Sequence, residues 1–356
     1  MAPKATVDRL SQTLVVPAGP TPTGPLRLSW LDRYPTQMAL MEVLDVYKPV
    51  RGMQKDPVKT IKHAVAEALV HYFPYAGRLA KSMDGEVHVL CEGQGVWFIE
   101  ANASCALEDV HYLEYPLMMA KDELSPHPRP RLDPFEEEKL ILLVQVTRFT
   151  CGGFVVGFRF RHAIADGTGH RQFKTAIGEI ARGQDKPTIE AEWRRDARGG
   201  ANRGAAWGTS GGFYGNCYYI MRVSADSERV VNSSIVEIVE MIKDGKKRLP
   251  LEFAKWAKGE LKVDPYQITS DYNTLLVSDW TRLGFAEVDY GWGPPTNVVP
   301  LTNLDYIATC IRVKPWAHKP GARLITQCVT AESVTAFHEG MVALDTLHQK
   351  GILARL

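Results

Sequence analysis

Residues 159–169 read RFRHAIADGTG and determine how the rest of the chain is interpreted. An apolar run ends at His162, an aspartate follows four positions later, and Gly-Thr-Gly comes next. The pattern predicts a strand that ends at the histidine and a turn that leads into a helix, a place where active-site groups are commonly found. Because the ordinary pKa of histidine is about 6.5, His162 is a candidate for a base that takes and returns a proton.

These residues alone also fit a histidine that caps a strand, with Asp166 and Gly167 in an ordinary turn. The H-x-x-x-D spacing is short, and chance matches to it are common. No G-x-S-x-G elbow accompanies it, so a serine nucleophile is not indicated. Thr168 lies between two glycines but lacks the lysine of a phosphate-binding loop.

Apolar periodicity on both sides of this stretch predicts an α/β protein. In residues 140–160 apolar side chains recur at every second position, which predicts two strands joined through 151–153. A helix is expected over 56–73, with Asp56 as its cap and Pro57 in its first turn, and another over 169–183, which Gly183 ends. The remaining expected elements are strands at 24–30, on both sides of a turn at 84–85, at 271–280, near 306–313 and at 322–329, a helix at 227–258, and a loop at 285–295.

The chain has 356 residues, which is more than a single hydrophobic core usually supports, so two lobes are expected. Residues 184–212 are rich in Gly, Arg and Ala and show no periodicity, which is typical of a linker. The predicted division is a first lobe at 1–183, a linker at 184–212, and a second lobe at 213–356.

Composition narrows the function classes. Apolar residues make up 45% and charged residues 23%, which is ordinary for a globular protein. The net charge is +1, so no strong positive electrostatic field indicates binding to nucleic acid or to an anionic membrane. No apolar run reaches the roughly 18 residues of a membrane span, and the N-terminus shows no secretory signal, so a cytoplasmic protein is expected. The six cysteines form no CxxC pair, which predicts buried free thiols and neither a zinc site nor a disulfide framework.

A second motif is DYGWG at 289–293. Gly291 and Gly293 permit a turn that other residues resist, and the Trp292 indole N–H is a hydrogen-bond donor. The alternative is an aromatic anchor under a loop. The basic run at 246–248 is interpreted as a solvated face, with binding of a CoA phosphate as the alternative.

The two motifs together resemble the H-x-x-x-D-G and D-F-G-W-G signatures of the BAHD family of plant acyl-CoA-dependent acyltransferases. Tyr290 stands where phenylalanine is usual. Further matches follow the family order: YAGRL at 75–79, TRFTCGGFVVG at 147–157, YGN at 214–216 and SDWTRLGFAEVDYGWG at 278–293. The stretch at 147–157 is most similar to the branch of taxane acyltransferases, benzyl alcohol benzoyltransferases and grass hydroxycinnamoyltransferases.

The resemblance implies a two-lobe fold like that of chloramphenicol acetyltransferase, each lobe a mixed sheet with helices, and a monomer. Acyl-CoA and a small acceptor enter a channel between the lobes from opposite sides. His162 would deprotonate the acceptor, which attacks the thioester directly, and Trp292 would stabilise the oxyanion. Asp166 would be structural and pair with an arginine, while Gly167 permits close backbone approach.

Other site residues are carried over from the same resemblance. Asp289, with Gly291 and Gly293, would support its loop. Contact with substrate or CoA is expected from Ser278, Trp280 and Tyr290.

The chain departs from the family pattern after its first lobe. Family members are longer, and a crossover with a helix separates a W-R-R-E/D-like stretch from YGN. Here WRRD at 193–196 is followed closely by YGN, which predicts a missing segment near Arg195 and a shortened second lobe. Arg198 is the first candidate partner for Asp166 and Arg203 the second; the alternative is that Arg198 is a solvated linker residue.

The sequence therefore predicts transfer of an acyl group, aromatic, hydroxycinnamoyl or acetyl, from acyl-CoA to a hydroxyl acceptor. Two alternatives stay open. One is an N-acyltransferase that uses an amine acceptor. The other is a non-catalytic relative that binds acyl-CoA, which the missing segment motivates.

Overall fold

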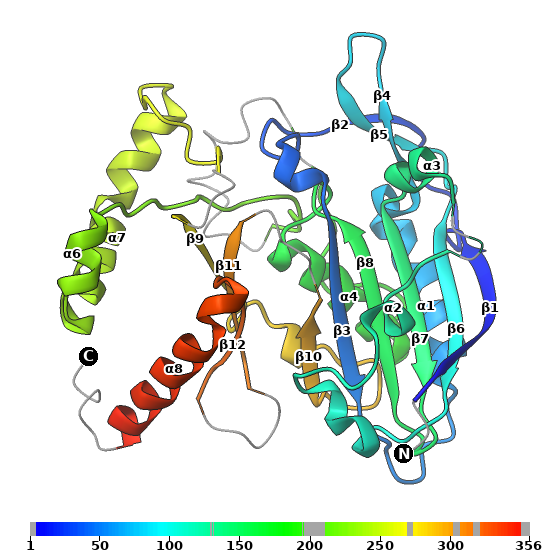
Figure 1. Cartoon of the computed structure of the whole chain (residues 1–356). Helices are drawn as coiled ribbons and strands as arrows, with labels where there is room; N and C mark the ends of the chain where they lie inside the picture. Colours follow the sequence, from blue (N-terminus) through cyan, green and yellow to red (C-terminus); the bar gives the residue numbers. More distant parts are fainter. Residues whose placement is uncertain are drawn as a thin grey trace. The chain divides into compact units, whose positions relative to one another are not determined.

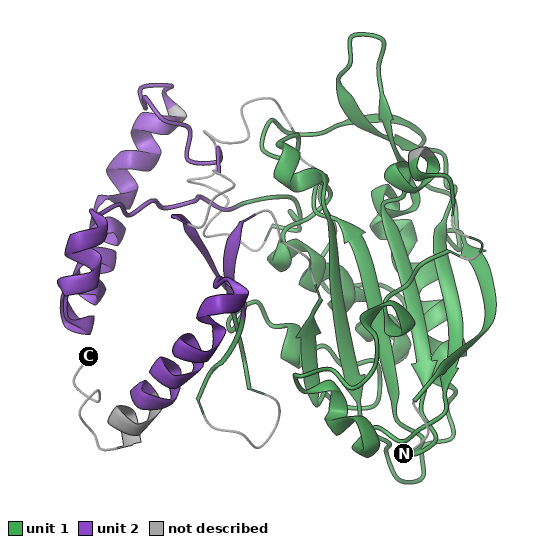
Figure 2. Cartoon of the chain, in the orientation of Figure 1, with its two compact units in different colours: residues 1–217, 279–303, 312–325 green, residues 218–278, 304–311, 326–356 purple. Residues whose placement is uncertain are grey.

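The computed structural model describes residues 5–128, 130, 132–193, 195, 211–268, 273–301, 307–315 and 321–349. The chain divides into two compact units (Figure 2). The first unit comprises residues 1–217, 279–303 and 312–325, and the second comprises 218–278, 304–311 and 326–356. Much of the predicted linker, residues 194 and 196–210, lies outside the described residues, so the boundaries at 183 and 212 stay predictions.

A six-stranded sheet forms the centre of the first unit (Figure 1). Its pairs are antiparallel except for β6 and β7, which run parallel. In spatial order the strands are β1 (Val7–Val15), β6 (Val96–Ala103), β7 (Leu142–Arg148), β8 (Phe154–Arg161), β3 (Leu40–Tyr47) and β10 (Asn297–Pro300).

The two strands predicted around residues 151–153 are confirmed as β7 and β8. They pair in register, with Val144 opposite Phe158 and Val146 opposite Val156. Both faces of β8 are covered, because Phe158 belongs to one apolar cluster and Val155 to another. This strand is therefore buried on both sides.

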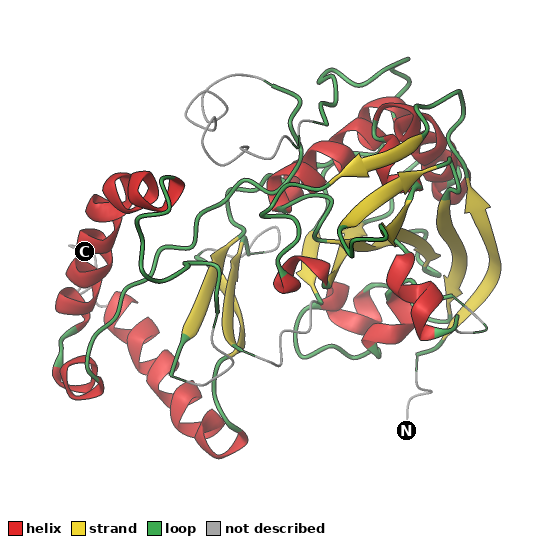
Figure 3. Cartoon of the chain, turned by 90° about the horizontal axis from the view of Figure 1, so that it is seen from above, coloured by secondary structure: helices red, strands yellow, loops and turns green. Residues whose placement is uncertain are grey.

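Two helices, α1 (Pro57–His71) and α4 (Gly167–Ala181), cover one face of the sheet, and shorter helices lie on the other (Figure 3). Helix α1 is confirmed with its predicted cap, since Asp56 Oδ1 accepts from the backbone N–H groups of Val58 at 2.8 Å and Lys59 at 3.2 Å. Helix α4 begins at Gly167, two residues earlier than predicted, because Asp166 caps it.

The remaining described elements form two three-stranded sheets and several helices. One sheet has the order β2 (Gly24–Arg27), β5 (Val87–Cys91), β4 (Arg78–Lys81), and the other has the order β12 (Arg323–Gln327), β11 (Ala308–Val313), β9 (Leu275–Asp279). The helices are α2 (Lys121–Leu124), α3 (Pro134–Lys139), α6 (Ser227–Asn232), α7 (Ile235–Ala257) and α8 (Val334–Gln349), with 3-10 turns at 35–38, 73–76, 108–113, 285–287 and 331–333.

The single helix predicted over 227–258 is wrong in one respect, because the chain breaks at Ser233 into α6 and α7. The cause is local. The Ser234 hydroxyl accepts from the Glu237 backbone N–H, and the Glu237 carboxylate accepts from the Ser234 backbone N–H, which forms a capping box. This reciprocal pair starts a new helix in the middle of a continuous apolar pattern.

Several apolar side chains of the second unit are exposed. Val236 and Leu251 on α7 are 51% and 61% exposed, and Val277 on β9 and Val342 on α8 are more exposed still. The helices of the second unit therefore leave apolar positions uncovered in this chain.

None of the helices in the described part of the chain combines the length and apolar character needed to cross a bilayer. Within the same residues, no group of three His, Cys, Asp or Glu side chains is arranged to hold a metal ion. All six cysteines are free, as predicted, but only Cys91 is buried and the other five are partly exposed.

Candidate active site

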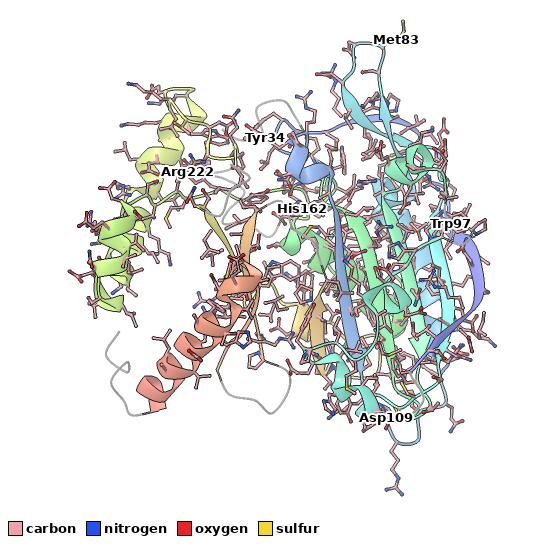
Figure 4. The ribbon with its side chains drawn as sticks, in the orientation of Figure 1. Tyr34, Met83, Trp97, Asp109, His162 and Arg222 are labelled. Carbon is pink, nitrogen blue, oxygen red and sulfur yellow. The ribbon has the colours of Figure 1, made fainter. Side chains whose placement is uncertain are left out.

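His162 lies immediately after the last residue of β8 and is partly exposed, as the sequence predicted for a strand end (Figure 4). Its backbone N–H donates to the carbonyl of Ala39 at 3.1 Å, which ties it to the segment that enters β3. The histidine therefore sits on a rigid part of the sheet, and the turn after it leads into α4.

Asp166 caps α4. Its Oδ1 accepts from the Gly169 backbone N–H at 3.0 Å, and its Oδ2 accepts from the Cys217 backbone N–H at 2.7 Å. The cap explains why the helix begins at Gly167. Both carboxylate oxygens thus bind backbone, which agrees with a structural role. Arg198 and Arg203, its predicted partners, lie outside the described residues.

Replacing Asp166 by alanine removes the helix cap and the link to Cys217 together. We expect Asp166→Ala to lower the free energy of unfolding by about 1–2 kcal/mol, the usual range for a lost cap. Asp166→Asn keeps one acceptor oxygen and is expected to lose less. Urea unfolding of both variants measures the difference; equal losses would contradict the cap assignment.

A buried network that sequence reasoning missed lies beneath His162. Asp32 Oδ2 forms an ion pair with Arg195 Nε at 2.9 Å, and Asp32 Oδ1 accepts from Asn216 Nδ2 at 2.8 Å. The same Asn216 amide donates to the backbone carbonyl of His162 at 2.7 Å, and Arg195 donates to that of Ile164 at 2.8 Å. The YGN match was the signal for Asn216, but it gave the residue no role.

Burial lowers the pKa of His162 below its ordinary value, and the charge of Asp166 opposes that shift. His170, one turn into α4, is fully buried and its pKa is lowered further. Its Nδ1 lies 3.3 Å from the Tyr75 hydroxyl. Both imidazoles are therefore neutral at neutral pH, and a neutral imidazole is the form that accepts a proton.

The start of α4 lies very close to residues 213–217. A Cβ added at Gly169 would lie 1.8 Å from the carbonyl oxygen of Tyr214, and one at Gly215 would lie 2.2 Å from the Arg195 guanidinium. A Cβ at Gly167 would meet only the Leu283 side chain, at 2.5 Å. The glycines of this region thus allow two backbone segments to meet beside Asp166.

Gly169→Ala is expected to destabilise the chain by about 1–3 kcal/mol, although alanine is the better helix former, because the clash is with backbone. Gly167→Ala is the matched control in the same turn, since a leucine side chain can move. Thermal unfolding of the two variants compares them. A Gly169→Ala variant at least as stable as Gly167→Ala would contradict the close approach.

The DYGWG loop is held by its own aspartate. Asp289 Oδ1 accepts from the backbone N–H groups of Gly291 at 2.6 Å and Gly293 at 2.8 Å. Those glycines have φ values of +105° and +80°, which other residues rarely adopt. Trp292 is 7% exposed, and its ring lies edge-on to Phe154 at 5.1 Å.

The contacts of this loop place it far from His162. Trp292 packs on Phe154, the first residue of β8, and His162 follows the last, so the strand separates them by roughly 25 Å. Helix α4 gives the same result, because Asp289 contacts Gly178 and Arg182 near its end. An oxyanion donor must lie about 3 Å from the reacting oxygen, so the role predicted for Trp292 finds no support in this geometry.

Tyr290 was predicted to contact substrate or CoA, but its side chain is fully buried. Its ring lies 5.4 Å from that of Tyr47, and the nearby Asp45 carboxylate, together with burial, raises the pKa of its hydroxyl. Asp45 forms a buried ion pair with Lys174 of α4. The structure therefore gives Tyr290 a packing position.

Trp280 lies nearer to the His162 end of α4. The backbone N–H of Leu283 donates to the Trp280 carbonyl at 3.2 Å, and the Leu283 side chain packs against Gly167. The Trp280 ring is partly exposed and lies 5.5 Å from Phe285. Ser278 is also partly exposed, but it belongs to the second unit.

The model of one protein family, described as the Transferase family, matches residues 5–204 and 209–343. The chain belongs to this family, the BAHD acyltransferases. The resemblance found in the two motifs is thereby confirmed over most of the chain. The break between the matched segments falls at 205–208, inside the part of the chain that was predicted to be shortened.

Named relatives of this BAHD chain support the assignment. Acyl transferase 7 of Oryza sativa subsp. japonica is 54% identical, with 97% of this chain and 99% of the relative covered. A myricetin 3-O-glucosyl 1,2-rhamnoside 6'-O-caffeoyltransferase of Crocosmia x crocosmiiflora is 33% identical, with 94% and 98% covered. The crystal structure of vinorine synthase matches with a TM-score of 0.60 at 17% identity, covering 86% of this chain and 91% of that one. That match confirms the predicted two-lobe fold class.

The alignment with acyl transferase 7 also bears on chain length. It extends over 435 positions, whereas this BAHD chain has 356 residues in all. Some aligned positions are therefore gaps in this chain, and the relative carries residues that this chain lacks. The predicted loss of a segment near Arg195 agrees with this difference in length.

Proposed function

We propose that this chain transfers an acyl group from acyl-CoA to a hydroxyl of a small-molecule acceptor, with His162 as the general base. The observation that carries the proposal is the place of His162 at the end of β8, where Asn216 donates to its backbone carbonyl and the cap residue Asp166 lies in the turn that follows. Membership of the BAHD family, and relatives named as acyl and caffeoyl transferases, supply the reaction class.

The reaction follows from the chemistry of the base. His162 takes the proton of the acceptor hydroxyl as its oxygen attacks the thioester carbonyl. The tetrahedral intermediate collapses, the carbon–sulfur bond breaks, and the imidazolium returns the proton to the CoA thiolate. One base thus serves both steps, no acyl-enzyme forms, and positioned general-base catalysis contributes about 10²–10⁴-fold.

The remaining roles belong to the same proposal. Trp280 is the predicted substrate-contacting residue that lies at the His162 end of α4, and Ser278 stays a second candidate. Asp166, Gly167 and Asp289 with its two glycines shape the backbone. The reaction requires neither a metal nor another cofactor, and we propose a cytoplasmic monomer.

The test is turnover by the purified chain. Acetyl-, benzoyl-, p-coumaroyl- and feruloyl-CoA are incubated with panels of alcohols and of amines, and released CoA thiol is measured together with the acylated product. We expect an ester with at least one alcohol. Products only from amines would change the acceptor class to the N-acyltransferase alternative, and no product from a cooperatively folded chain would overturn the proposal.

A second candidate function is binding of acyl-CoA without turnover. Two observations favour it, the residues that this chain lacks relative to acyl transferase 7 and the exposed apolar positions of the second unit. Thermal unfolding with and without CoA separates the cases, because a ligand that binds the folded state stabilises it by RT ln(1 + [L]/Kd). A CoA-dependent rise in the midpoint without turnover would favour this candidate.

A further inference from the structure

Asn216 occupies an unusual place beside His162. It is fully buried, and the two hydrogens of its side-chain amide go to two different acceptors, the Asp32 carboxylate and the His162 backbone carbonyl. Neither of those oxygens can donate, so the amide has only one possible orientation. Beside these two contacts, hydrogen bonding to this side chain raises the pKa of His162.

The support for Asn216 is itself fixed. Asp32 is fully buried, accepts from Asn216 and from the backbone N–H of Ser29 at 2.9 Å, and forms an ion pair with Arg195. Arg195 is also buried, and its guanidinium lies 4.0 Å from the centre of the Trp193 ring. A buried carboxylate with this many donors cannot rotate without losing several of them.

We infer that Asn216 is a positioning residue for the His162 imidazole and that Asp32, neutralised by Arg195, holds Asn216 in the orientation that does this. The inference rests on the proposed role of His162 as base. Asn216 bonds the main chain of His162 where β8 ends, so its side chain fixes the point from which the imidazole reaches the acceptor hydroxyl. Asn216 thus acts through His162 and need not touch the substrate.

Several charged or titratable groups act on His162. Asp166 and Asp32 both raise the pKa of the imidazole, hydrogen bonding to Asn216 raises it too, and burial lowers it. His170 interacts electrostatically with the same ring from α4. Loss of the Asn216 side chain therefore lowers the pKa of His162 further, and the acid limb of the pH–rate profile moves to lower pH.

The experiment compares Asn216→Leu, which keeps the size but not the amide, with Gln172→Leu. Gln172 is a matched buried amide, hydrogen-bonded to Tyr72 at 3.1 Å and to the Gly212 carbonyl at 3.0 Å, with no described contact to His162. For Asn216→Leu we expect kcat to fall roughly 10-fold or more with KM for acyl-CoA little changed, and the acid limb to move down by roughly half a pH unit or more. Gln172→Leu should lower stability only.

Asp32→Asn is the second variant, for the case in which Asn216→Leu does not fold. It removes the negative charge but keeps the shape, so the acid limb is again expected to move down. An acid limb that stays in place in both variants, or moves equally in Gln172→Leu, would overturn the positioning role.

A titration independent of turnover separates this inference from the proposed function. The histidine ring signals are followed by NMR against pH, and a His162→Gln variant assigns the His162 signal. If the wild-type chain shows no turnover but the His162 pKa falls in Asn216→Leu, the function proposal fails and the positioning contact stands. If turnover is present and the pKa is unchanged, the positioning contact is wrong.

Discussion

His162→Ala is expected to lower kcat by about 10²–10⁴-fold, because it removes the group that takes and returns the proton. The side chain is partly exposed and lies at the end of β8, so its loss leaves the core intact. Thermal unfolding should therefore show a midpoint close to that of the unaltered chain. His162→Gln, which keeps a polar side chain but cannot act as the base, is expected to behave in the same way.

The matched control for this prediction is His88→Ala. His88 is also partly exposed, but it lies in β5 of a separate small sheet. This variant should keep its turnover. A His162→Ala variant that retains more than a tenth of the wild-type kcat would contradict the role of His162, whatever the effect on stability.

The second large effect is expected at the buried ion pair that joins α4 to β3. Lys174 Nζ lies 2.6 Å from Asp45 Oδ2, and neither side chain is accessible to solvent. Lys174→Met leaves the Asp45 carboxylate without its counter-charge in the core. Breaking one partner of such a pair typically costs about 3–5 kcal/mol, a large part of the stability of a domain.

The double variant Lys174→Met, Asp45→Leu separates the pair from the packing around it. Replacing both charges by apolar side chains of similar size is often close to neutral, so the double variant should recover most of the loss. Urea unfolding of the three proteins measures this. A double variant as unstable as Lys174→Met would show that packing, and not the unpaired charge, causes the loss.

The pH dependence of Lys174→Met supplies a further check on the same prediction. Burial raises the pKa of Asp45, and Lys174 opposes that shift. Without the lysine the carboxyl binds its proton more tightly in the folded state than in the unfolded state. The variant should therefore regain stability as the pH falls, and its deficit should be larger at pH 8 than at pH 6.

Local chemistry made parts of the fold predictable. The cap and first-turn proline of α1 and the alternation of β7 and β8 depend on residues close together in the sequence, and all three were found as expected. Strand β10 was missed because it has only four residues and no pattern of its own. The break between α6 and α7 was missed because a continuous apolar stripe concealed the Ser234 capping box.

The candidate site was predictable only in part. The motif around His162 was visible, because the strand, the cap and the helix follow one another along the chain. Asp32 and Asn216 meet across 184 positions, so no local pattern could connect them. Trp292 is the converse case, since two motifs that occur in one sequence need not lie together in space, and here the length of β8 separates its ring from His162.

The late pairing of β10 has a consequence for biosynthesis. Asn297–Pro300 pairs with residues 43–46 of β3, so the free edge of β3 must wait for roughly 250 further residues to be translated. At about 5–20 residues per second, that edge stays open for about 10–50 seconds on the ribosome. An unpaired edge of a hydrophobic sheet readily pairs with other chains. Slower translation between these segments, or lack of chaperones that shield nascent strands, is therefore expected to lower the yield of soluble protein more than the stability of the finished fold would indicate.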